Sequence, residues 1–558
     1  MYEQAFASPL QLLSIGIGAW GFWRVLRSFL FKDPLAVIPG PPSASWPLGD
    51  LPKLFDKRPG NYQEDLFKKY GRTFRITGLF KESLLVVSDP KALYRILIKD
   101  QDIFEESDDT VSPSGQDYSQ PLATASPHSF HTDRINILDP VFSAAYMRDN
   151  TPVFCSVVHK LENSIEQLVG SGEKEIDLLS WMTRTALELV AQSGLGYTFD
   201  TLEPHASEHP YATSIRNWVG TVNDPVVTVI RFLLYPYVYN IGGPRFQRTV
   251  VNVLPWKKLH AIRDMVDVMH KTSIDIFENA KRGLDKGDDA RERIAKGKDI
   301  MSALLKANML ASEGDKLPDE ELIAQVSTLT FAAMDTTSNA LSRILYLLSE
   351  HPEVQERLRG EVTQAYTHHG GDMDYETLNA LPYLDAVCRE SLRVYTPAPF
   401  VTRQARKDAV VPLATPITTT EGREINELFV PKDTLLFIAL GNCNRDPLIW
   451  GPEATEWKPE RWLSPQPESV TQARIPGVYS NLMTFLGGGR SCIGFKFSQL
   501  EMKIVLSVLL AKVKFAPSGK NIVWLSNGIV QPAVEDPKRP GSGETELQLP
   551  LKVSLVAE

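Results

Sequence analysis

The sequence predicts a mainly helical α+β protein, in which small β-sheets accompany one large helical body. Helical periodicity dominates residues 90–395 and is interrupted only by loops. Two segments of β-rich composition, "RTFRITGLF" and "SLLVVSDP", come before that region and carry turn residues between them. Short strands are expected again from about residue 516 to the end of the chain.

Residues 1–32 are predicted to form an N-terminal membrane anchor with a basic flank. The run 5–23 is mostly apolar and uncharged, close to the roughly 20 residues that a spanning helix needs. Basic residues follow this run and only Glu3 precedes it, which is the reverse of a secretory signal. The positive-inside rule then puts the body of the protein in the cytoplasm. Polar residues within the run leave an amphipathic or buried helix as the alternative.

Three further segments are predicted from composition. Residues 33–52 are rich in proline, which cannot continue a helix, and suggest an extended hinge before the body of the protein at 53–558. Residues 105–130 are polar with many Pro and Ser, as in a loop. Residues 201–255 mix Pro, Gly and large apolar residues, so we expect a mobile apolar cover that could touch a membrane.

Charge and cysteine content exclude some classes of protein. The net charge is −9 and the pI about 5.7, whereas a nucleic-acid binder usually has a basic face. No C-x-x-C pair occurs, so the spacings of zinc sites and disulfide frameworks are absent. The chain also has no Asn-x-Ser/Thr acceptor, which fits a body in a reducing compartment. The four cysteines are Cys155, Cys388, Cys443 and Cys492.

The segment "FLGGGRSCIGF", residues 485–495, has features of a ligand site. A helix is predicted over 495–513, so Cys492 lies at or just before a helix N-terminus, where amide N–H groups favour an anionic sulfur. Its glycines allow a flat ligand to approach the backbone closely. Arg490 can pair with an anionic group of that ligand. A lone cysteine is more often a small buried hydrophobe, so the loop alone does not decide between the two.

The whole pattern Phe485-x-x-Gly488-x-Arg490-x-Cys492-x-Gly494 resembles the haem-binding signature of the cytochrome P-450 family, position by position. The resemblance implies the P-450 fold and a haem b cofactor (iron protoporphyrin IX). It further implies that the Cys492 thiolate is the axial iron ligand, with Phe485, Gly488 and Arg490 binding the cofactor.

Glu390 and Arg393 in "CRESLRVYTPAP" are similar to the family's E-x-x-R helix, and Arg461 in "PERW" to the third partner of that ion network. A Glu/Arg pair at this spacing is normally a weak surface pair. The resemblance implies instead a buried structural network.

An uninterrupted helix is predicted from Asp319 to Glu350, spanning about 48 Å. In the P-450 family this helix crosses the distal face of the haem, and Asp335 and Thr336 match its acid-threonine pair. A mid-helix threonine can bond back to the carbonyl four residues earlier and open a groove that holds water and relays protons. Taken alone, such a threonine is more often only back-bonded.

Two residues are implied to contact the haem propionates. Arg403 in "FVTRQARKD" is similar to a family arginine with that role, and His131 keeps its family position. The family's second arginine falls on Ile135, however, with Arg134 one place early. We therefore expect residues 106–138 to be aberrant and haem to bind substoichiometrically.

The resemblance implies an NADPH- and O2-dependent monooxygenase. The chain is similar to basidiomycete members of secondary metabolism, so the expected substrate is a lipophilic small molecule, with a terpenoid the best candidate. Electrons would come from a membrane-bound NADPH-cytochrome P-450 reductase that docks near Cys492, at the endoplasmic reticulum membrane. A haem-thiolate isomerase or dehydratase without reductase is one alternative, disfavoured by the Asp335–Thr336 pair. A haem-poor inactive relative is the other.

Overall fold

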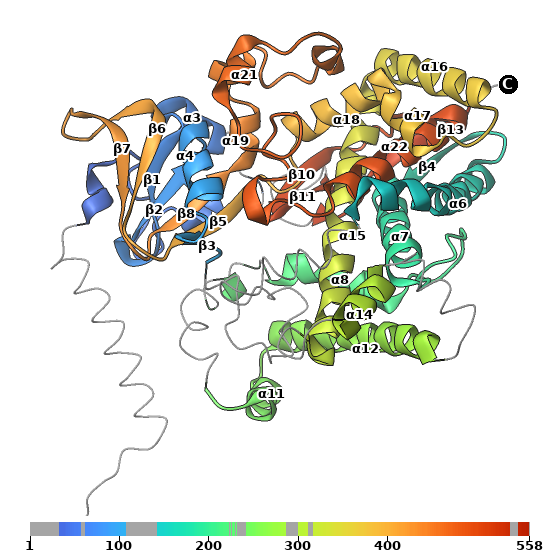
Figure 1. The fold of residues 1–558 in the computed structure, drawn as a ribbon, viewed down its shortest axis with the longest axis horizontal. Helices are drawn as coiled ribbons and strands as arrows, with labels where there is room; N and C mark the ends of the chain where they lie inside the picture. The colour runs from blue at the N-terminus through green and yellow to red at the C-terminus, as the bar shows by residue number, and fades with distance from the viewer. Residues whose placement is uncertain are drawn as a thin grey trace, which may run out of the picture. The chain divides into compact units, whose positions relative to one another are not determined.

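The computed structural model describes residues 33–56, 58, 62–107, 142–222, 224, 226–228, 230, 241–285, 300–310, 316–535 and 545–556 (Figure 1). The chain divides into two compact units, Met1–Glu105 with Val401–Ala439, and Glu106–Phe400 with Leu440–Glu558. The predicted anchor at 5–23 lies outside the described residues. Within the described part, every helix is too short or too polar to span a bilayer.

The first unit is built on a five-stranded sheet. Strands β1 (Thr73–Thr77) and β2 (Ser83–Val87) form the predicted antiparallel hairpin, with Thr73 opposite Val87. β2 is buried along its whole length and also pairs in parallel with β8. The sheet order is β1-β2-β8 (Leu435–Ala439)-β5 (Phe400–Ala405)-β3 (Phe104–Glu105), and a separate hairpin joins β6 (Ala409–Thr418) to β7 (Glu424–Val430). Its helices are α2 (Leu51–Leu54), α3 (Tyr62–Tyr70) and α4 (Pro90–Tyr94).

Residues of the predicted proline-rich hinge pack along β1. The Arg75 N–H donates to the carbonyl of Pro39 at 2.9 Å, and Asp50 Oδ2 accepts from the Thr77 N–H at 2.8 Å. At Gly40 a Cβ atom would lie 1.9 Å from the Arg75 carbonyl oxygen, so only glycine allows this approach. These contacts make residues 39–50 part of the first unit.

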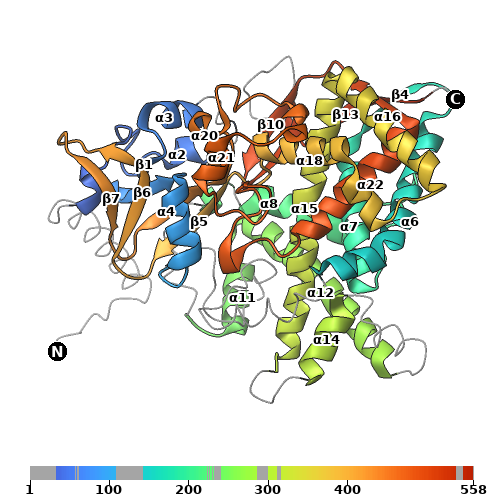
Figure 2. The same ribbon diagram turned by 45° about the horizontal axis from the view of Figure 1, so that its top comes forward.

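The second unit is organised around one long helix, α15 (Asp319–Glu350), whose bounds match those predicted from the sequence (Figures 1 and 2). Three acidic residues begin it and Pro352 follows its end, as the helix dipole and the proline restriction require. The helices packed around it are α7 (Leu178–Val190), α12 (Lys257–Asp285), α14 (Ile300–Leu310), α16 (Pro352–His369), α18 (Pro382–Val394) and α22 (Phe495–Lys512).

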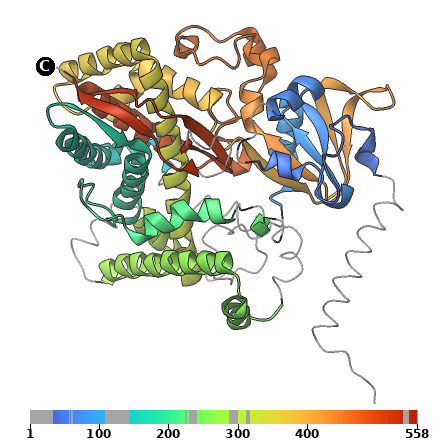
Figure 3. The same ribbon diagram turned by 180° about the vertical axis from the view of Figure 1, so that it is seen from behind.

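Other helices and two small sheets complete this unit. Helix α8 (Pro210–Val222) packs against α12, and α11 (Pro244–Val253) follows within the segment predicted as an apolar cover (Figure 3). The C-terminal strands expected from residue 516 are present. The sheets are β4 (Glu173–Asp177)-β13 (Pro550–Leu555)-β9 (Val513–Pro517) and β10 (Ile522–Asn527)-β11 (Ile529–Glu535)-β12 (Thr545–Glu546). The remaining helices are α6 (Ala144–Val169), α17 (Tyr375–Ala380), α19 (Leu440–Asn444), α20 (Pro447–Trp450) and α21 (Glu468–Ala473).

The predicted mainly helical α+β class with small sheets is therefore confirmed.

Candidate active site

The loop before α22 is closed by its own backbone. The Cys492 N–H donates to the carbonyl of Phe485 at 2.9 Å, and Gly488 has a φ of +80°. A Cβ on Gly487 would lie 1.8 Å from the carbonyl oxygen of Pro476, so a side chain there would force the loop apart. Helix α22 begins at Phe495, which puts Cys492 just before a helix N-terminus, as predicted.

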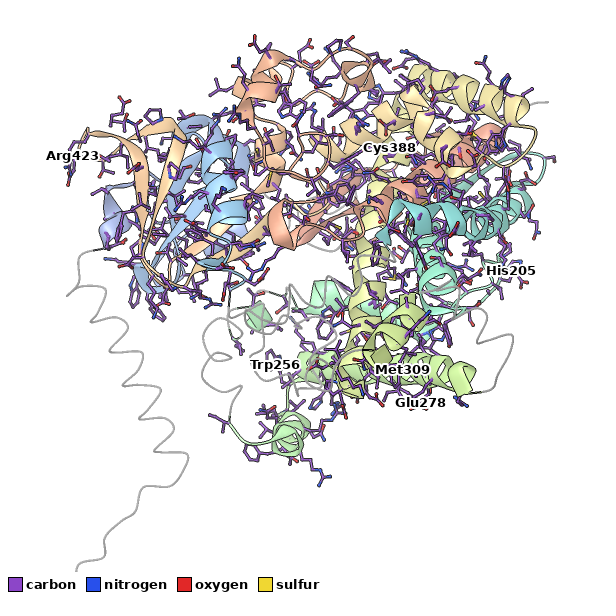
Figure 4. The ribbon with its side chains drawn as sticks, in the orientation of Figure 1. His205, Trp256, Glu278, Met309, Cys388 and Arg423 are labelled. Carbon is purple, nitrogen blue, oxygen red and sulfur yellow. The ribbon has the colours of Figure 1, made fainter. Side chains whose placement is uncertain are left out.

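The side chain of Cys492 differs from the other three cysteines. Cys492 is exposed, whereas Cys155, Cys388 and Cys443 are buried; Cys388 lies on α18 inside the helical unit (Figure 4). Desolvation by the surrounding protein atoms nevertheless raises the pKa of Cys492 to about 11, against the lowering effect of the Gly494 N–H. Protein atoms therefore crowd around the thiol, although the cysteine keeps exposed surface.

This combination fits the haem thiolate that the sequence predicts. An open sulfur can reach a metal, and a coordinated metal ion deprotonates a thiol outright, which overcomes the effect of burial on the pKa. The Gly494 N–H then points at the sulfur and tunes the ligand. The helix N-terminus favours an anionic sulfur, as predicted, and so lowers the pKa of the thiol. Burial raises that pKa, and in the protein alone the effect of burial is the larger one.

Arg490 and Phe485 flank the cysteine. Nη1 of Arg490 lies 3.0 Å from Oε2 of Glu106, and both side chains are mostly buried. The guanidinium thus sits in a position where it can bind a carboxylate; its predicted pairing with a haem propionate stays a prediction. Phe485 is buried, and its ring makes an edge contact with Tyr479 and a tilted contact with Phe495, at centroid distances of 5.7 and 6.1 Å.

The predicted E-x-x-R network is present and buried. Arg393 and Glu390 have no exposed side-chain surface and form two parallel hydrogen bonds of 2.8 Å each. Arg461 approaches Glu390 Oε1 at 3.3 Å. Desolvation favours the neutral form of Glu390, but Arg393, the Lys458 N–H and Arg461 together lower its pKa. The carboxylate is thereby held ionised, as a structural network requires.

Asp335 lies on the buried side of α15. Its Oδ1 accepts from Gln531 Nε2 at 2.9 Å and from Asn339 Nδ2 at 3.3 Å. Its Oδ2 is buried with no hydrogen-bond partner among the described residues. Burial raises the pKa of Asp335 to about 6, and the two amides only partly offset this effect. A carboxyl group that titrates near neutral pH is suited to proton transfer.

Thr336 lies on the open side of the same helix turn. Its Oγ1 donates to the carbonyl of Ala332 at 2.7 Å, the back-bonding that the sequence predicts for a mid-helix threonine. Ala332 is exposed and Thr336 half-buried, although most of the surrounding helix is buried. The open stretch of α15 is therefore centred on the residues before and at the acid-threonine pair.

A hydrogen bond joins this turn of α15 to the start of α22. Thr337 Oγ1 donates to Ser498 Oγ at 3.1 Å, and the Ser498 N–H donates to the carbonyl of Gly494 at 2.9 Å. Thr337 follows Thr336 directly, and Gly494 lies two residues after Cys492. The structure thus brings Asp335, Thr336 and Cys492 into one region of the second unit.

Two predicted cofactor-binding residues lie outside the described part of the second unit. Arg403 is buried in the first unit, where its Nη1 donates to the carbonyl of Thr402 at 2.7 Å. His131 lies outside the described residues, as does most of the segment 106–138 that we expect to be aberrant. Their contacts with haem propionates remain predictions.

The sequence did not identify the polar partners of Asp335 and Arg490. Gln531 contacts Asp335 across 196 positions of the sequence. The Val530 N–H also donates to the carbonyl of Pro397 at 2.8 Å, which joins β11 to the segment after α18. Gln531 is the single polar side chain in the apolar segment "GIVQPAV". A buried amide needs a hydrogen-bond partner, so this pattern could have indicated a polar contact, though not which residue makes it.

Comparisons with known proteins find a matching family model and relatives that cover almost the whole chain. The family model described as Cytochrome P450 matches residues 39–535. The chain is 45% identical to cytochrome P450 monooxygenase 91 of Postia placenta, over 96% of this chain and 97% of the relative. It is 41% identical to a ganoderic acid synthetase of Ganoderma lucidum (96% and 97%) and 35% identical to the cytochrome P450 monooxygenase eriI of Hericium erinaceus (96% of each). The chain therefore belongs to the cytochrome P450 family and is a haem-dependent monooxygenase.

Proposed function

We propose that this monooxygenase oxidises a lipophilic small molecule of secondary metabolism, with a terpenoid as the substrate class. The observation that carries the proposal is the open stretch of α15, where Thr336 and Ala332 retain exposed surface next to the buried Asp335. An open stretch on a buried helix, in the same region as the exposed Cys492 sulfur, suits a reaction between a bound substrate and a cofactor.

The apolar surroundings of that stretch support a lipophilic substrate. Phe331, one turn before Asp335, packs against an apolar cluster on α8 and α12. Such a site selects mainly by shape, with few polar groups to fix orientation. The name of the Ganoderma relative refers to ganoderic acid, which supports the terpenoid class for this chain. The members of the cluster are Trp218, Val222, Ile262, Met265 and Val266.

The chain's own residues have two tasks in this proposal. Cys492 would hold the haem iron, Arg490 would pair with a carboxylate of the cofactor, and the glycines of the loop would admit its flat face. When bound, haem supplies oxygen activation, which the thiolate favours. Asp335 and Thr336 deliver protons, so that one oxygen atom enters the substrate and the other leaves as water with two electrons from NADPH.

We also propose a membrane location and a reductase partner. The apolar run 5–23 with its basic flank supports a single-pass anchor in the endoplasmic reticulum with a cytosolic body. Helix α11 adds exposed apolar side chains, Phe246, Val250 and Val253.

Deletion of residues 1–32 should release most of the protein from membranes and leave the haem spectrum unchanged. Loss of the spectrum on deletion would contradict the anchor.

The test of the reaction compares wild type with Thr336→Ala. The reduced wild-type protein should give a thiolate-type carbon monoxide difference spectrum, and products should form only with reductase and NADPH. Thr336→Ala should keep that spectrum and the substrate-induced spectral shift, but yield less product per NADPH because proton delivery is lost. Products formed without reductase would identify an isomerase or dehydratase. An unchanged product yield per NADPH would exclude the relay.

A further inference from the structure

The carboxyl group of Asp335 is held from another part of the fold. Gln531 on β11 donates from Nε2 to Oδ1 of Asp335 at 2.9 Å, and both side chains are almost completely buried. Asn339 donates to the same oxygen at 3.3 Å and to the Asp335 carbonyl at 2.6 Å. Both amides therefore converge on Oδ1, and Gln531 is the donor that comes from outside α15.

The second carboxyl oxygen of Asp335, Oδ2, has a different environment from Oδ1. Oδ2 is buried and has no hydrogen-bond partner in the described part of the chain. A buried polar atom without a partner is costly, and the cost falls when a proton is added to that atom. Because Oδ1 already accepts two hydrogen bonds, Oδ2 is the oxygen on which a proton is best accommodated.

The carboxyl group of Asp335 has no charged partner in the described part of the chain. No charged side chain on the elements that pack against α15 forms an ion pair or hydrogen bond with it there. Burial and the two amides thus dominate its environment, with Gln531 the larger of the two amide effects. The charged residues include Arg343 on α15 itself, Glu188 on α7, Arg393 on α18, Glu501 on α22 and Glu535 on β11.

The strand that carries Gln531 is itself fixed. Gln531 lies opposite Leu525 in the β10–β11 ladder, and the neighbouring Val530 N–H donates to the Pro397 carbonyl at 2.8 Å. Successive residues of a strand point to opposite faces, so the two side chains leave β11 in opposite directions. The backbone at Gln531 is therefore held from both sides, which gives its amide a fixed position.

We propose that Gln531 is a positioning residue that orients the Asp335 carboxyl group for proton delivery to Thr336. It holds Oδ1 in place, and Oδ2 is then the oxygen that gains and loses the proton. This inference rests on the proposed Asp335–Thr336 relay. It adds that a residue of the β10–β11 hairpin, 196 positions from Asp335 in the sequence, controls which carboxyl oxygen exchanges the proton and at what pH.

The test uses Gln531→Met in the full-length holoenzyme, because methionine keeps the length of the side chain and removes the donor. The matched control is Gln355→Met. Gln355 is also fully buried and donates to the carbonyls of Leu348 and Phe515, at 2.8 and 2.9 Å. Protonation of Asp335 is followed by its carboxylic acid band in infrared difference spectra across pH, assigned by its loss in Asp335→Asn. Product per NADPH and thermal unfolding are measured on the same samples.

Gln531→Met should move the midpoint of the Asp335 band upward by about one pH unit, since a charge-assisted hydrogen bond to the ionised form is lost. Product per NADPH should fall roughly threefold to tenfold, a part of the ~100-fold that a positioned proton donor contributes. Gln355→Met should lower the unfolding temperature with the band and the product yield unchanged.

Three results would overturn the inference. An unshifted band with a normal yield in Gln531→Met, while Asp335→Asn still loses yield, would leave the relay intact and remove Gln531 from it. A normal yield in both Asp335→Asn and Thr336→Ala would remove the relay itself, and with it the role of Gln531. A fall in yield of equal size in Gln355→Met would show that both glutamines act only through stability.

Discussion

Two buried carboxylates in the second unit, Glu390 and Asp335, have opposite environments. Glu390 accepts from two arginines and from the indole Nε1–H of Trp462 at 2.9 Å, and its pKa is lowered. Asp335 has two neutral amides on one oxygen and, in the described part of the chain, no partner on the other, and its pKa is raised to about 6. Equal burial therefore does not imply an equal role. Full pairing with cations makes a carboxylate structural, whereas incomplete pairing leaves it able to exchange a proton.

Cys492→Ser should have the largest effect on activity, and it should leave the fold unchanged. A neutral hydroxyl cannot replace the thiolate as axial ligand, so activity and the thiolate-type carbon monoxide band should be lost completely. The fold should persist, because the Cys492 side chain is exposed. Circular dichroism and the carbon monoxide spectrum check both parts, with Cys155→Ser as a control that keeps the band. A band that survives in Cys492→Ser would mean that the ligand is elsewhere.

Glu390→Ala should have the largest effect on stability. It leaves the fully buried guanidinium of Arg393 without its carboxylate, which typically costs about 3–5 kcal/mol. Chemical denaturation of the holoenzyme measures the loss, and haem retention should fall with it. Glu390→Gln keeps the shape and removes only the charge. If Glu390→Ala unfolds at the wild-type denaturant concentration, the network is not structural and the comparison fails.

The pH dependence of stability should also separate the two carboxylates. The Glu390 pKa is lowered in the folded state, so its contribution is present above its unfolded pKa and is lost as the pH falls through the folded value. The Asp335 pKa is raised, so the native state keeps a proton that the unfolded chain releases. Stability from Asp335 therefore decreases as the pH rises from about 3.8 to about 6.

Asp335→Asn tests that difference directly at pH 7. Removal of a buried charge that the fold disfavours should increase the free energy of unfolding, by at most about 3 kcal/mol for the raised pKa. Product per NADPH should fall in the same variant. Denaturation at pH 7 and pH 4.5 checks the sign, because the gain should shrink at the lower pH. A loss of stability at pH 7 would place Asp335 with Glu390 as a structural carboxylate.

Arg461→Ala should have the smallest effect. Its guanidinium lies 3.3 Å from Glu390, a longer contact than those of Arg393, and the bidentate pair survives its loss. We expect a decrease of about 1 kcal/mol in the free energy of unfolding, typical of one hydrogen bond, with normal activity. A decrease as large as that of Glu390→Ala would mean that the network works as a triad rather than as a pair with a weaker third member.

Local sequence signals predicted the parts of the site that depend on neighbouring residues. The bounds of α15 follow from its acidic start and Pro352, and the position of Cys492 before α22 follows from an uninterrupted apolar helix. Contacts across long sequence separations were not predictable in this way. The bond from Gln531 to Asp335 and the ion pair of Arg490 with Glu106 depend on how β11 and the loops pack, and the residues carry no shared local pattern.

The open sulfur of Cys492 has a practical consequence for handling the protein. Three of its four thiols are buried, so an alkylating reagent has little access to them in the folded state. Cys492 is accessible only while no iron is bound to it. Mass spectrometry after mild alkylation would therefore count the molecules in a preparation that lack cofactor, one adduct for each. The predicted haem ligand is thus also a built-in label for the quality of a preparation.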